Sequence, residues 1–266
     1  MENLRITAIQ TALHWEDPVA NRAMLEEKIF NIGASTDVII LPEMFTTAFT
    51  MNAQALAEAM NLQSTKWMKQ MAGQTGALVL GSVIIKESGK YLNRMIWMEP
   101  GGKYLTYDKR HLFRMAKEHT VFAGGQGRLI DAWKGWRICP LVCYDLRFPA
   151  WSRNRYDKAS RSLEYDLLVY AANWPQPRVS AWDTLLKARA IENLSFVAGV
   201  NRVGPDPHGV LYNGHSAVID PRGDVLWFGA EAEAVHTVVL DADMLLEHRE
   251  RFPAYLDADS FRLDND

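Results

Sequence analysis

The sequence of 266 residues predicts a single-domain α/β protein with buried sheets, and three observations lead to this prediction. Hydrophobic residues make up 48% and charged residues 23% of the chain, the usual balance of a globular protein with a buried core. Short apolar runs alternate with longer amphipathic stretches. The runs VIIL, PLVC and LLVY show no period-two alternation, so both faces of these strands should be covered. One doubly wound sheet and two packed sheets with outer helices fit this pattern equally well.

In the first half of the chain, apolar runs predict strands and amphipathic segments predict helices. The first helix has favourable ends, because Pro18 follows Asp17 at its start and Gly33 stands at its end. The elements expected here are strands over 4–11, 37–43, 77–87 and 91–100 and helices over 18–33 and 53–73.

The second half continues the alternation after a polar, irregular stretch over 101–128. A connection of this length without regular structure is often functional. The elements expected beyond it are strands over 136–143, 165–173, 195–204, 215–220, 224–229 and 236–243 and helices over 147–160 and 179–193. No linker interrupts the pattern, so we expect one domain over 1–255 and an acidic tail over 256–266.

Charge and cysteine content exclude several classes of protein. The chain carries 29 basic and 32 acidic residues, a net charge of −3, which offers no electrostatic footprint for nucleic acid or an anionic membrane. Cys139 and Cys143 lie in one extended segment, where a rise of about 3.3 Å per residue places them about 13 Å apart, too far for a disulfide. Neither a signal-peptide pattern nor an apolar run of about 18 residues is present. A cytoplasmic protein is therefore expected.

Three of the apolar strands end in reactive or polar residues. Glu43 follows VIILP, Cys143 ends ICPLVC and Asn173 ends LLVYAAN. Ligands of open α/β sheets bind beyond the carboxyl ends of the strands, so parallel, neighbouring strands would bring these side chains to one crevice. Lys109, within the irregular stretch, could reach the same place. Cysteine, glutamate and lysine together are a set of groups suited to acyl transfer.

Ordinary structural roles are also open to these residues. A buried cysteine is usually a small hydrophobic side chain, a glutamate after a strand often caps a helix, and a lysine between Asp108 and Arg110 is usually solvated. A Cys–His enzyme is a further alternative. The histidines available to Cys143 are His111, His119, His208 and His215. No spacing of histidine and cysteine fits a metal site, so a bound metal is not expected.

Four blocks of the sequence together resemble the carbon–nitrogen hydrolase (nitrilase) superfamily. Three of them contain the candidate residues: LPEMF has Glu43, YDKRHLF has Lys109 and LVCYDLRFP has Cys143. The fourth is KARAIEN (187–193), and AANWP lies between it and the third block. The resemblance covers nearly the whole chain. It implies a four-layer αββα sandwich that forms a homodimer in which the sheets continue across the interface.

The resemblance implies a catalytic triad of Glu43, Lys109 and Cys143. In the chemistry of the family, the glutamate takes the thiol proton, the cysteine attacks an amide carbon to form a thioester, and water then hydrolyses the thioester. Lys109 and the backbone N–H of Tyr144 would stabilise the oxyanion. Neither a metal nor an organic cofactor is implied.

A second glutamate of the family matches Glu118, in the segment AKEHTVFAGG. The match departs from the usual family pattern in two ways. His119 follows where a small residue is usual, and Gly124 and Gly125 stand where Pro-Gly is usual. The resemblance implies that Glu118 orients Lys109 or the substrate amide.

Within the superfamily, WRICPLVCYDLRFPAWSRN most resembles the bacterial ω-amidase branch. This implies hydrolysis of the terminal amide of 2-oxoglutaramate, a short α-keto acid amide, to 2-oxoglutarate and ammonia in metabolite repair. Arg147 is the candidate clamp for the substrate carboxylate, and a structural ion pair with Asp145 or another acidic residue is its alternative role. Asn173 and Trp174 are expected to line the pocket.

Other activities share the same triad. Aliphatic amidases, carbamoylases and nitrilases differ in pocket shape, so each stays an alternative, as does an inactive scaffold that kept the fold. Met44 or Phe45 could form the pocket wall beside Glu43. The partner expected for this chain is a small amide, with no nucleic acid and no membrane.

Overall fold

Two six-stranded β-sheets form the centre of the protein, of which the computed structural model describes residues 1–263. The first sheet contains, in hydrogen-bonded order, β16 (Ala234–Leu240), β1 (Leu4–Gln10), β2 (Val38–Ile40), β3 (Leu78–Glu87), β4 (Lys90–Met98) and β5 (Tyr104–Asp108). The second contains β15 (Val225–Phe228), β14 (Ala217–Ile219), β11 (Phe196–Val200), β10 (Leu167–Ala171), β7 (Trp136–Val142) and β6 (Asp131–Trp133). Both have parallel central strands, β1–β2–β3 and β7–β10–β11, flanked by antiparallel ones.

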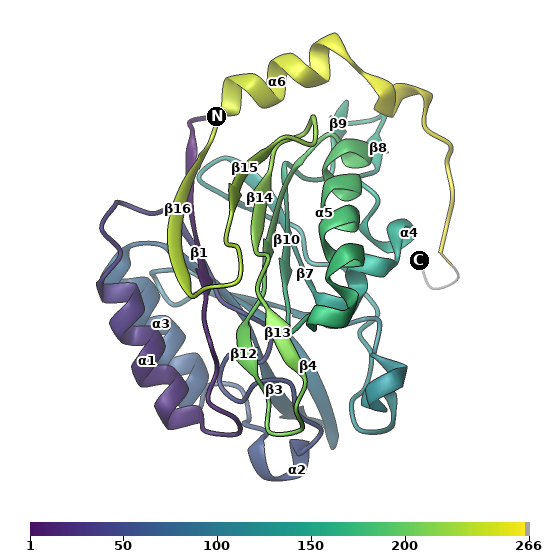
Figure 1. Ribbon diagram of the computed structural model, residues 1–266. Coiled ribbons are helices and arrows are strands. Elements are labelled where there is room, and N and C mark those ends of the chain that lie inside the picture. The colour runs from purple at the N-terminus through teal and green to yellow at the C-terminus, as the bar shows by residue number, and fades with distance from the viewer. Residues whose placement is uncertain (264–266) are drawn as a thin grey trace.

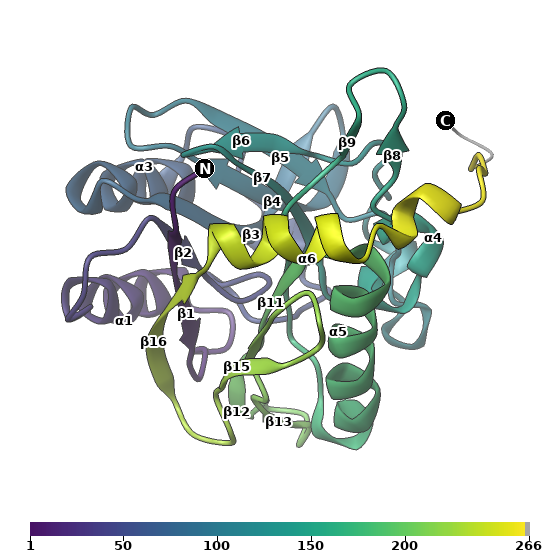
Figure 2. The ribbon, with the colours of Figure 1, turned by 90° about the horizontal axis from the view of Figure 1, so that it is seen from above.

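Helices cover the outer faces of both sheets (Figures 1 and 2). α1 (Pro18–Phe30) and α3 (Gln63–Thr75) lie against the first sheet, and α5 (Val179–Asn193) lies against the second. α6 (Ala242–Arg251) crosses one end of the sandwich (Figure 1). The arrangement is the four-layer αββα sandwich that the resemblance implied, and it decides between the two sheet arrangements that the sequence pattern left open.

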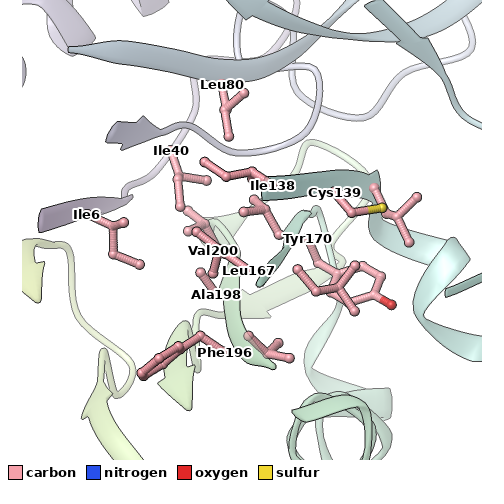
Figure 3. Packing of buried hydrophobic residues seen from close by; sticks show 14 of the residues in the cluster. Ile6, Ile40, Leu80, Ile138, Cys139, Leu167, Tyr170, Phe196, Ala198 and Val200 are labelled. Atoms are coloured by element: carbon pink, nitrogen blue, oxygen red, sulfur yellow. The ribbon is translucent and has the colours of Figure 1, made fainter. Parts of the chain in front are cut away.

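The core between the sheets is built from alternate residues of the central strands. Ile40 and Leu80 of the first sheet share one hydrophobic cluster with Ile138 of the second (Figure 3). Their chain neighbours Ile39 and Val79 belong to a different cluster, with side chains of α1 and α3. Both faces of these strands are therefore buried, which is why their sequences lack a period of two.

The first helix begins where the sequence predicts and ends earlier. The Asp17 side chain accepts a hydrogen bond from the Ala20 N–H at 2.9 Å and caps the start of α1. The helix ends at Phe30, three residues before Gly33.

The expectation of one helix over 53–73 is wrong. The segment forms α2 (Ala53–Leu56) and α3, which are separated by residues that pair with a strand. The Glu58 N–H donates to the Ile84 carbonyl at 3.1 Å, and the Glu58 carbonyl accepts from the Lys86 N–H at 2.8 Å. The Glu58 carboxylate also accepts from the Ser64 N–H at 2.8 Å in the first turn of α3. Long-range pairing with β3 therefore overrides the local helical preference.

The helix expected over 147–160 is also largely wrong. Only α4 (Pro149–Ser152) is helical, and the chain then forms a hairpin of β8 (Tyr156–Asp157) and β9 (Ser162–Leu163). Asn154 fixes the change of direction, because its N–H donates to Asn193 Oδ1 at 2.9 Å. Its Nδ2 donates to the Tyr165 carbonyl, also at 2.9 Å. Contacts distant in the sequence again decide the local structure.

Several elements have no counterpart in the sequence analysis. β5 lies inside the stretch 101–128 that was expected to be irregular, and α6 begins within the strand expected over 236–243. Asp241 ends that strand and caps α6, since its side chain accepts from the Met244 N–H at 3.0 Å. The other elements missed are β6 and the two strands of a small hairpin, β12 (Val203–Pro205) and β13 (Leu211–Asn213).

The C-terminal part of the chain lies partly outside the described residues. The expected domain boundary at 255 falls within a 3₁₀ turn, η5 (Ala254–Asp257), and residues 264–266 of the expected tail lie outside the described part. The boundary stays a prediction. Within residues 1–263, the longest apolar helices are too short or too polar to cross a membrane.

Candidate active site

The strand ends bring the candidate residues together from both sheets. Cys143 and Asn173 follow β7 and β10, which are parallel, hydrogen-bonded neighbours in the second sheet. Glu43 and Lys109 follow β2 and β5 of the first sheet. The expected convergence therefore occurs, but Glu43 reaches the site from the facing sheet and not from a neighbouring strand.

A buried lysine lies between two buried carboxylates. Lys109 Nζ donates to Glu43 Oε1 at 2.8 Å and to the two carboxylate oxygens of Glu118 at 3.0 and 2.9 Å. Asn93 Nδ2 also donates to Glu43 Oε1, at 2.8 Å. The Phe113 N–H donates to Glu118 Oε2 at 2.6 Å. The side chains of all three charged residues have no exposed surface, so this cluster is held entirely by the protein.

The charges within the cluster oppose the effect of burial. Burial alone would lower the pKa of Lys109, but the nearby Glu118 and Glu43 carboxylates hold this pKa above its ordinary value. Burial raises the pKa of Glu118, against the opposing attraction of Lys109. The lysine is therefore protonated at neutral pH and places a fixed positive charge in the wall of the site.

Cys143 stands on a sharp turn between β7 and the 3₁₀ helix η3 (Cys143–Arg147). Its φ of +43° lies in the left-handed region, which is uncommon for residues other than glycine and concentrates at functional sites. Its Sγ donates to the Asn173 carbonyl at 3.9 Å, and the Asn173 N–H donates to Glu43 Oε2 at 2.9 Å. Burial, followed by the charge of Glu43, raises the pKa of the Cys143 thiol well above its ordinary value. The resting thiol is protonated, so a thiolate forms only when a nearby base takes the proton.

A cavity of about 570 Å³ opens beside Cys143 and Lys109. This size is typical of a small-molecule site. Asn173 and Trp174 line it, as expected. The other lining residues come mostly from loops and short 3₁₀ helices, with Tyr212 from β13. They are Trp15, Glu16, Phe49, Thr50, Met51, Asn52, Phe113, Ala116, Tyr144, Arg147, Pro175, Arg178, Asp206, His208, Val210 and Tyr212.

The cavity wall does not contain Met44 or Phe45, which the sequence analysis suggested for it. Both are fully buried. Phe45 packs against Trp67 of α3, on the outer side of the first sheet. The cavity wall contains Phe49 and Phe113 instead.

Arg147 lies in the cavity wall with its guanidinium free of carboxylate partners among residues 1–263. Its Cζ is 4.9 Å from the centre of the Trp174 ring. The alternative role, an ion pair with Asp145, does not occur, because Asp145 pairs with His111 and accepts from Tyr107. The hydrogen-bond donors of Arg147 therefore stay available to a ligand in the cavity.

The chain also matches a known protein family over most of its length. A family model for carbon–nitrogen hydrolases matches residues 5–250. The chain belongs to the carbon–nitrogen hydrolase family. The resemblance inferred from the four sequence blocks is confirmed, and the protein is an enzyme that hydrolyses carbon–nitrogen bonds.

Three relatives illustrate the similarity. The chain is 48% identical to omega-amidase YafV of Escherichia coli strain K12 over 267 aligned residues, which cover 99% of this chain and 100% of the relative. It is 33% identical to the 2-oxoglutaramate amidase of Bacillus subtilis strain 168, covering 95% of this chain and 96% of the relative. The crystal structure of XC1258 from Xanthomonas campestris, a CN-hydrolase superfamily protein with an arsenic adduct in the active site, superposes with a TM-score of 0.97 at 46% identity, covering 99% and 100% of the two chains.

Sequence reasoning missed a carboxylate that joins the two sheets of this carbon–nitrogen hydrolase. Asp145, fully buried two residues after Cys143, accepts from the Tyr107 hydroxyl at 2.8 Å and from the Val142 N–H at 3.0 Å. It also accepts from the His111 N–H at 3.0 Å and contacts His111 Nδ1 at 2.8 Å. The segments that carry Lys109 and Cys143 thus share one anchor. An acidic residue two positions after the candidate cysteine was the available signal.

The KARAIEN block of this hydrolase contacts the 3₁₀ helix that begins at Cys143. Arg189 of α5 is buried, and its Nη2 donates to the Leu146 carbonyl within η3 at 2.6 Å. Its Nη1 pairs with Glu192 at 3.0 Å. The block contacts the segment that begins at Cys143 and is absent from the cavity wall.

The histidines do not form a pair with Cys143. In the described part of the chain, the hydrogen bond of its sulfur goes to Asn173. The four histidines have other environments: His111 binds Asp145, His208 packs edge-on against Trp15, His215 binds Asp183 and His119 is exposed. Across residues 1–263, groups of three or more His, Cys, Asp or Glu arranged for a metal ion are also lacking. The Cys–His alternative is wrong for this geometry.

Proposed function

We propose that this enzyme is an ω-amidase that hydrolyses 2-oxoglutaramate to 2-oxoglutarate and ammonia. The observation that supports it most is a single cavity with Cys143, Lys109 and the carboxylate-free guanidinium of Arg147 in its wall. An amide at one end of a short chain would meet the thiol, and a carboxylate at the other end would meet the arginine. The names of the relatives from Escherichia coli and Bacillus subtilis agree with this substrate.

The first chemical step is proton transfer from Cys143 to Glu43. The thiolate attacks the amide carbon, and negative charge develops on the amide oxygen. Lys109, with its fixed positive charge, and the backbone N–H of Tyr144 stabilise that charge. One such donor typically contributes about 3–4 kcal/mol. The Tyr144 N–H suits this role because it lies in the first turn of η3, where N–H groups have no partner within the helix.

Protonated Glu43 then acts as an acid. It gives its proton to the leaving nitrogen, the C–N bond breaks, ammonia departs and the acyl group stays on Cys143 as a thioester. Water enters the cavity, Glu43 takes a proton from it, and hydroxide attacks the thioester carbon. The thiol regains the proton as the 2-oxoglutarate leaves. Neither a metal nor an organic cofactor takes part in this scheme.

Glu118 acts through Lys109 in this scheme. Both oxygens of its carboxylate accept from Lys109 Nζ, and the Phe113 N–H holds one of them. The lysine is thereby fixed in position and in its charged state. Glu118 is a positioning residue in this scheme, and orienting the substrate amide is its alternative role.

A panel of amides tests the substrate assignment. Ammonia release is measured from 2-oxoglutaramate, glutamine, asparagine, propionamide, a carbamoyl amino acid and a simple nitrile, with Cys143→Ala as the control enzyme. A strong preference for 2-oxoglutaramate that disappears in Cys143→Ala supports the proposal. Activity on another panel member alone would keep the cysteine chemistry and replace the ω-amidase by an aliphatic amidase, carbamoylase or nitrilase. Silence on the whole panel, with Cys143 unreactive to alkylation, would favour an inactive scaffold.

The resemblance also leads us to propose a cytoplasmic homodimer with its catalytic domain over 1–255. Light scattering coupled to gel filtration should give twice the 30.2 kDa of one chain. A mass of one chain at micromolar concentration would contradict the dimer.

A further inference from the structure

Two half-buried arginines of the cavity wall differ from other arginines of the protein in the partners of their guanidinium groups. The fully buried Arg202 donates to backbone carbonyls, such as that of Pro205 at 3.1 Å. Arg94, Arg137 and Arg249 each contact a carboxylate, at 2.6, 2.7 and 2.5 Å. Arg147 and Arg178 both line the cavity, and neither contacts a carboxylate oxygen within residues 1–263. Within the described residues, the guanidinium contacts of the two are with aromatic rings and a sulfur atom, so their N–H donors are available to an anionic group of a ligand in the cavity.

The Arg147 side chain and the Arg178 backbone both contact the indole ring of Trp174. Arg147 lies over the face of Trp174, with Cζ 4.9 Å from the ring centre. Trp174 Nε1 donates to the backbone carbonyl of Arg178 at 2.8 Å, which fixes η4 (Gln176–Arg178) against the same ring. Trp174 is 3% exposed and also packs against Trp182 of α5. The buried indole therefore fixes the position of the Arg178 backbone relative to the Arg147 guanidinium.

The contacts of the Arg178 side chain are weak ones. Its Cζ is 5.2 Å from the centre of the Phe113 ring, and its Nη1 is 3.8 Å from the sulfur of Met115. Neither contact uses an oxygen acceptor. An arginine has five N–H donors, so most of the donors of Arg178 are free to move to a ligand.

We propose that Arg178 holds the 2-oxo acid end of the substrate together with Arg147, and that Arg178 selects the 2-oxo acid amide over the corresponding 2-amino acid amide. The proposal deepens the proposed ω-amidase function and rests on it. A 2-oxo acid group presents three oxygens that are all acceptors, which match two forks of N–H donors. Glutamine carries an ammonium at the position of the keto oxygen, so it would place positive charge and three donors beside a guanidinium.

Two carboxylates at the cavity wall, those of Glu16 and Asp206, oppose the effect of Arg178 on substrate selection. Glu16 lines the cavity, and its carboxylate accepts from Thr50 Oγ1 and from Asn52 Nδ2. Asp206 also lines the cavity, and its Oδ1 accepts from the His208 and Val210 N–H groups, each at 2.9 Å. Both would attract an ammonium group. With Arg178 removed, the balance of charge at the wall therefore shifts toward the amino acid amide.

Kinetics with matched substrates test the proposal. In Arg178→Met, KM for 2-oxoglutaramate should rise about tenfold or more, as expected for loss of a hydrogen bond to a charged group. The ratio of kcat/KM for 2-oxoglutaramate to that for glutamine should fall at least as much, and the loss on butyramide should be far smaller. Arg178→Lys keeps the charge without the fork and should retain most of the discrimination against glutamine. Arg114→Met, which removes an exposed charge from the neighbouring turn outside the cavity wall, should match wild type.

Equal losses on 2-oxoglutaramate and butyramide, or an unchanged glutamine ratio, would overturn the proposal. Calorimetry provides a readout without turnover: 2-oxoglutarate should bind Cys143→Ala at least tenfold more tightly than it binds the double variant Cys143→Ala/Arg178→Met. Equal binding to the two would also overturn it. If wild type released no ammonia from 2-oxoglutaramate, the proposed function would fail, and calorimetry would still decide whether Arg178 binds a 2-oxo acid.

Discussion

Two groups of charged residues at the candidate site differ in how they are partnered, and we name them by their proposed roles. The catalytic end is Lys109 with Glu43, Glu118 and Cys143, and the recognition end is Arg147 with Arg178. At the catalytic end, Lys109 is bound by Glu43 and Glu118 within 3.0 Å, and all three side chains are fully buried. At the recognition end, Arg147 and Arg178 rest on aromatic rings and have no carboxylate partner in residues 1–263. The catalytic end is therefore complete before a substrate arrives, whereas the recognition end keeps its hydrogen-bonding capacity for the substrate. Substitutions at the first should lower kcat, and substitutions at the second should raise KM.

The largest effect is expected at the nucleophile. Cys143→Ala should reduce ammonia release by about 10⁴-fold or more, because the covalent step is lost, while the fold is retained. Activity is measured by ammonia release and folding by thermal unfolding. Turnover at a near wild-type rate would remove Cys143 from the mechanism.

Cys139 provides the matched control for that experiment. It lies four residues earlier on β7, belongs to a buried hydrophobic cluster and has no exposed surface. Burial raises its pKa to about 12. Cys139→Ala should cost about 1 kcal/mol of unfolding free energy and leave kcat unchanged. Alkylation of wild type should modify Cys143 well before Cys139, because only the former lines the cavity.

The next largest effect is expected at the lysine of the catalytic end. Lys109→Met should lower kcat by about 10³-fold, since the oxyanion loses its positive charge. The variant should also lose about 3–5 kcal/mol of unfolding free energy, because two buried carboxylates are left without their cation. A loss confined to KM would contradict the assignment of Lys109 to the catalytic end.

The stability of that variant should depend on pH in a defined direction. Burial already raises the pKa of Glu118 with Lys109 present, and removing the lysine raises it further. A carboxyl group whose folded pKa lies above its unfolded value near 4.3 binds its proton more tightly in the folded state. The contribution of Glu118 to the stability of Lys109→Met should therefore be fully present below about pH 4.3 and should be lost as the pH rises through the folded pKa of Glu118. Chemical denaturation between pH 4 and pH 8 measures this, with wild type as the reference.

The sequence predicts the catalytic end better than the recognition end, for a physical reason. Glu43, Cys143 and Asn173 end buried strands, and an abrupt change from apolar to reactive residues is visible without a structure. The facing position of β2 is not visible, because a covered strand has the same pattern in one large sheet and in two packed ones. Arg178 lies in the connection NWPQPR, where no periodicity distinguishes a residue that lines a cavity from one exposed to solvent.

The errors in the fold have a common origin in contacts between distant segments. Glu58 interrupts a helical pattern because it pairs with β3, and Asn154 ends another because it binds Asn193 at the end of α5. Local preference is weak compared with such contacts. Conversely, the helix expected over 179–193 matches α5 in full, because its packing agrees with its local pattern.

A smaller effect is expected at the recognition end. Arg147→Met should raise KM for 2-oxoglutaramate by about 10- to 100-fold with little change in kcat, because a charge-assisted hydrogen bond to the substrate is lost. Neutral amides of the same length should be affected much less. An equal loss on both kinds of amide would show that Arg147 shapes the cavity and does not bind a carboxylate. The exposed Arg114→Met serves as the charge control.

The smallest effect on rate is expected at Asp145. A substitution there tests whether this carboxylate holds the catalytic end in its geometry before substrate binds. Its carboxylate accepts from Tyr107, Val142 and His111, and so joins the segments before Lys109 and Cys143. In Asp145→Asn, one oxygen becomes an NH₂ group that faces donors only. The expected cost is about 1–3 kcal/mol of unfolding free energy.

Asp145 touches neither cavity nor substrate, so its effect on catalysis must pass through the geometry of its neighbours. We expect kcat to fall about tenfold in Asp145→Asn, KM to change little, and Cys143 to be alkylated more slowly. Asp183→Asn is the matched control, since Asp183 also binds a histidine, His215, but lies at the surface away from the nucleophile. It should leave all three quantities unchanged. Lower stability in Asp145→Asn with unaltered kcat and alkylation rate would mean that the catalytic end keeps its geometry without this anchor, and that Glu118 and Asn173 suffice to hold it.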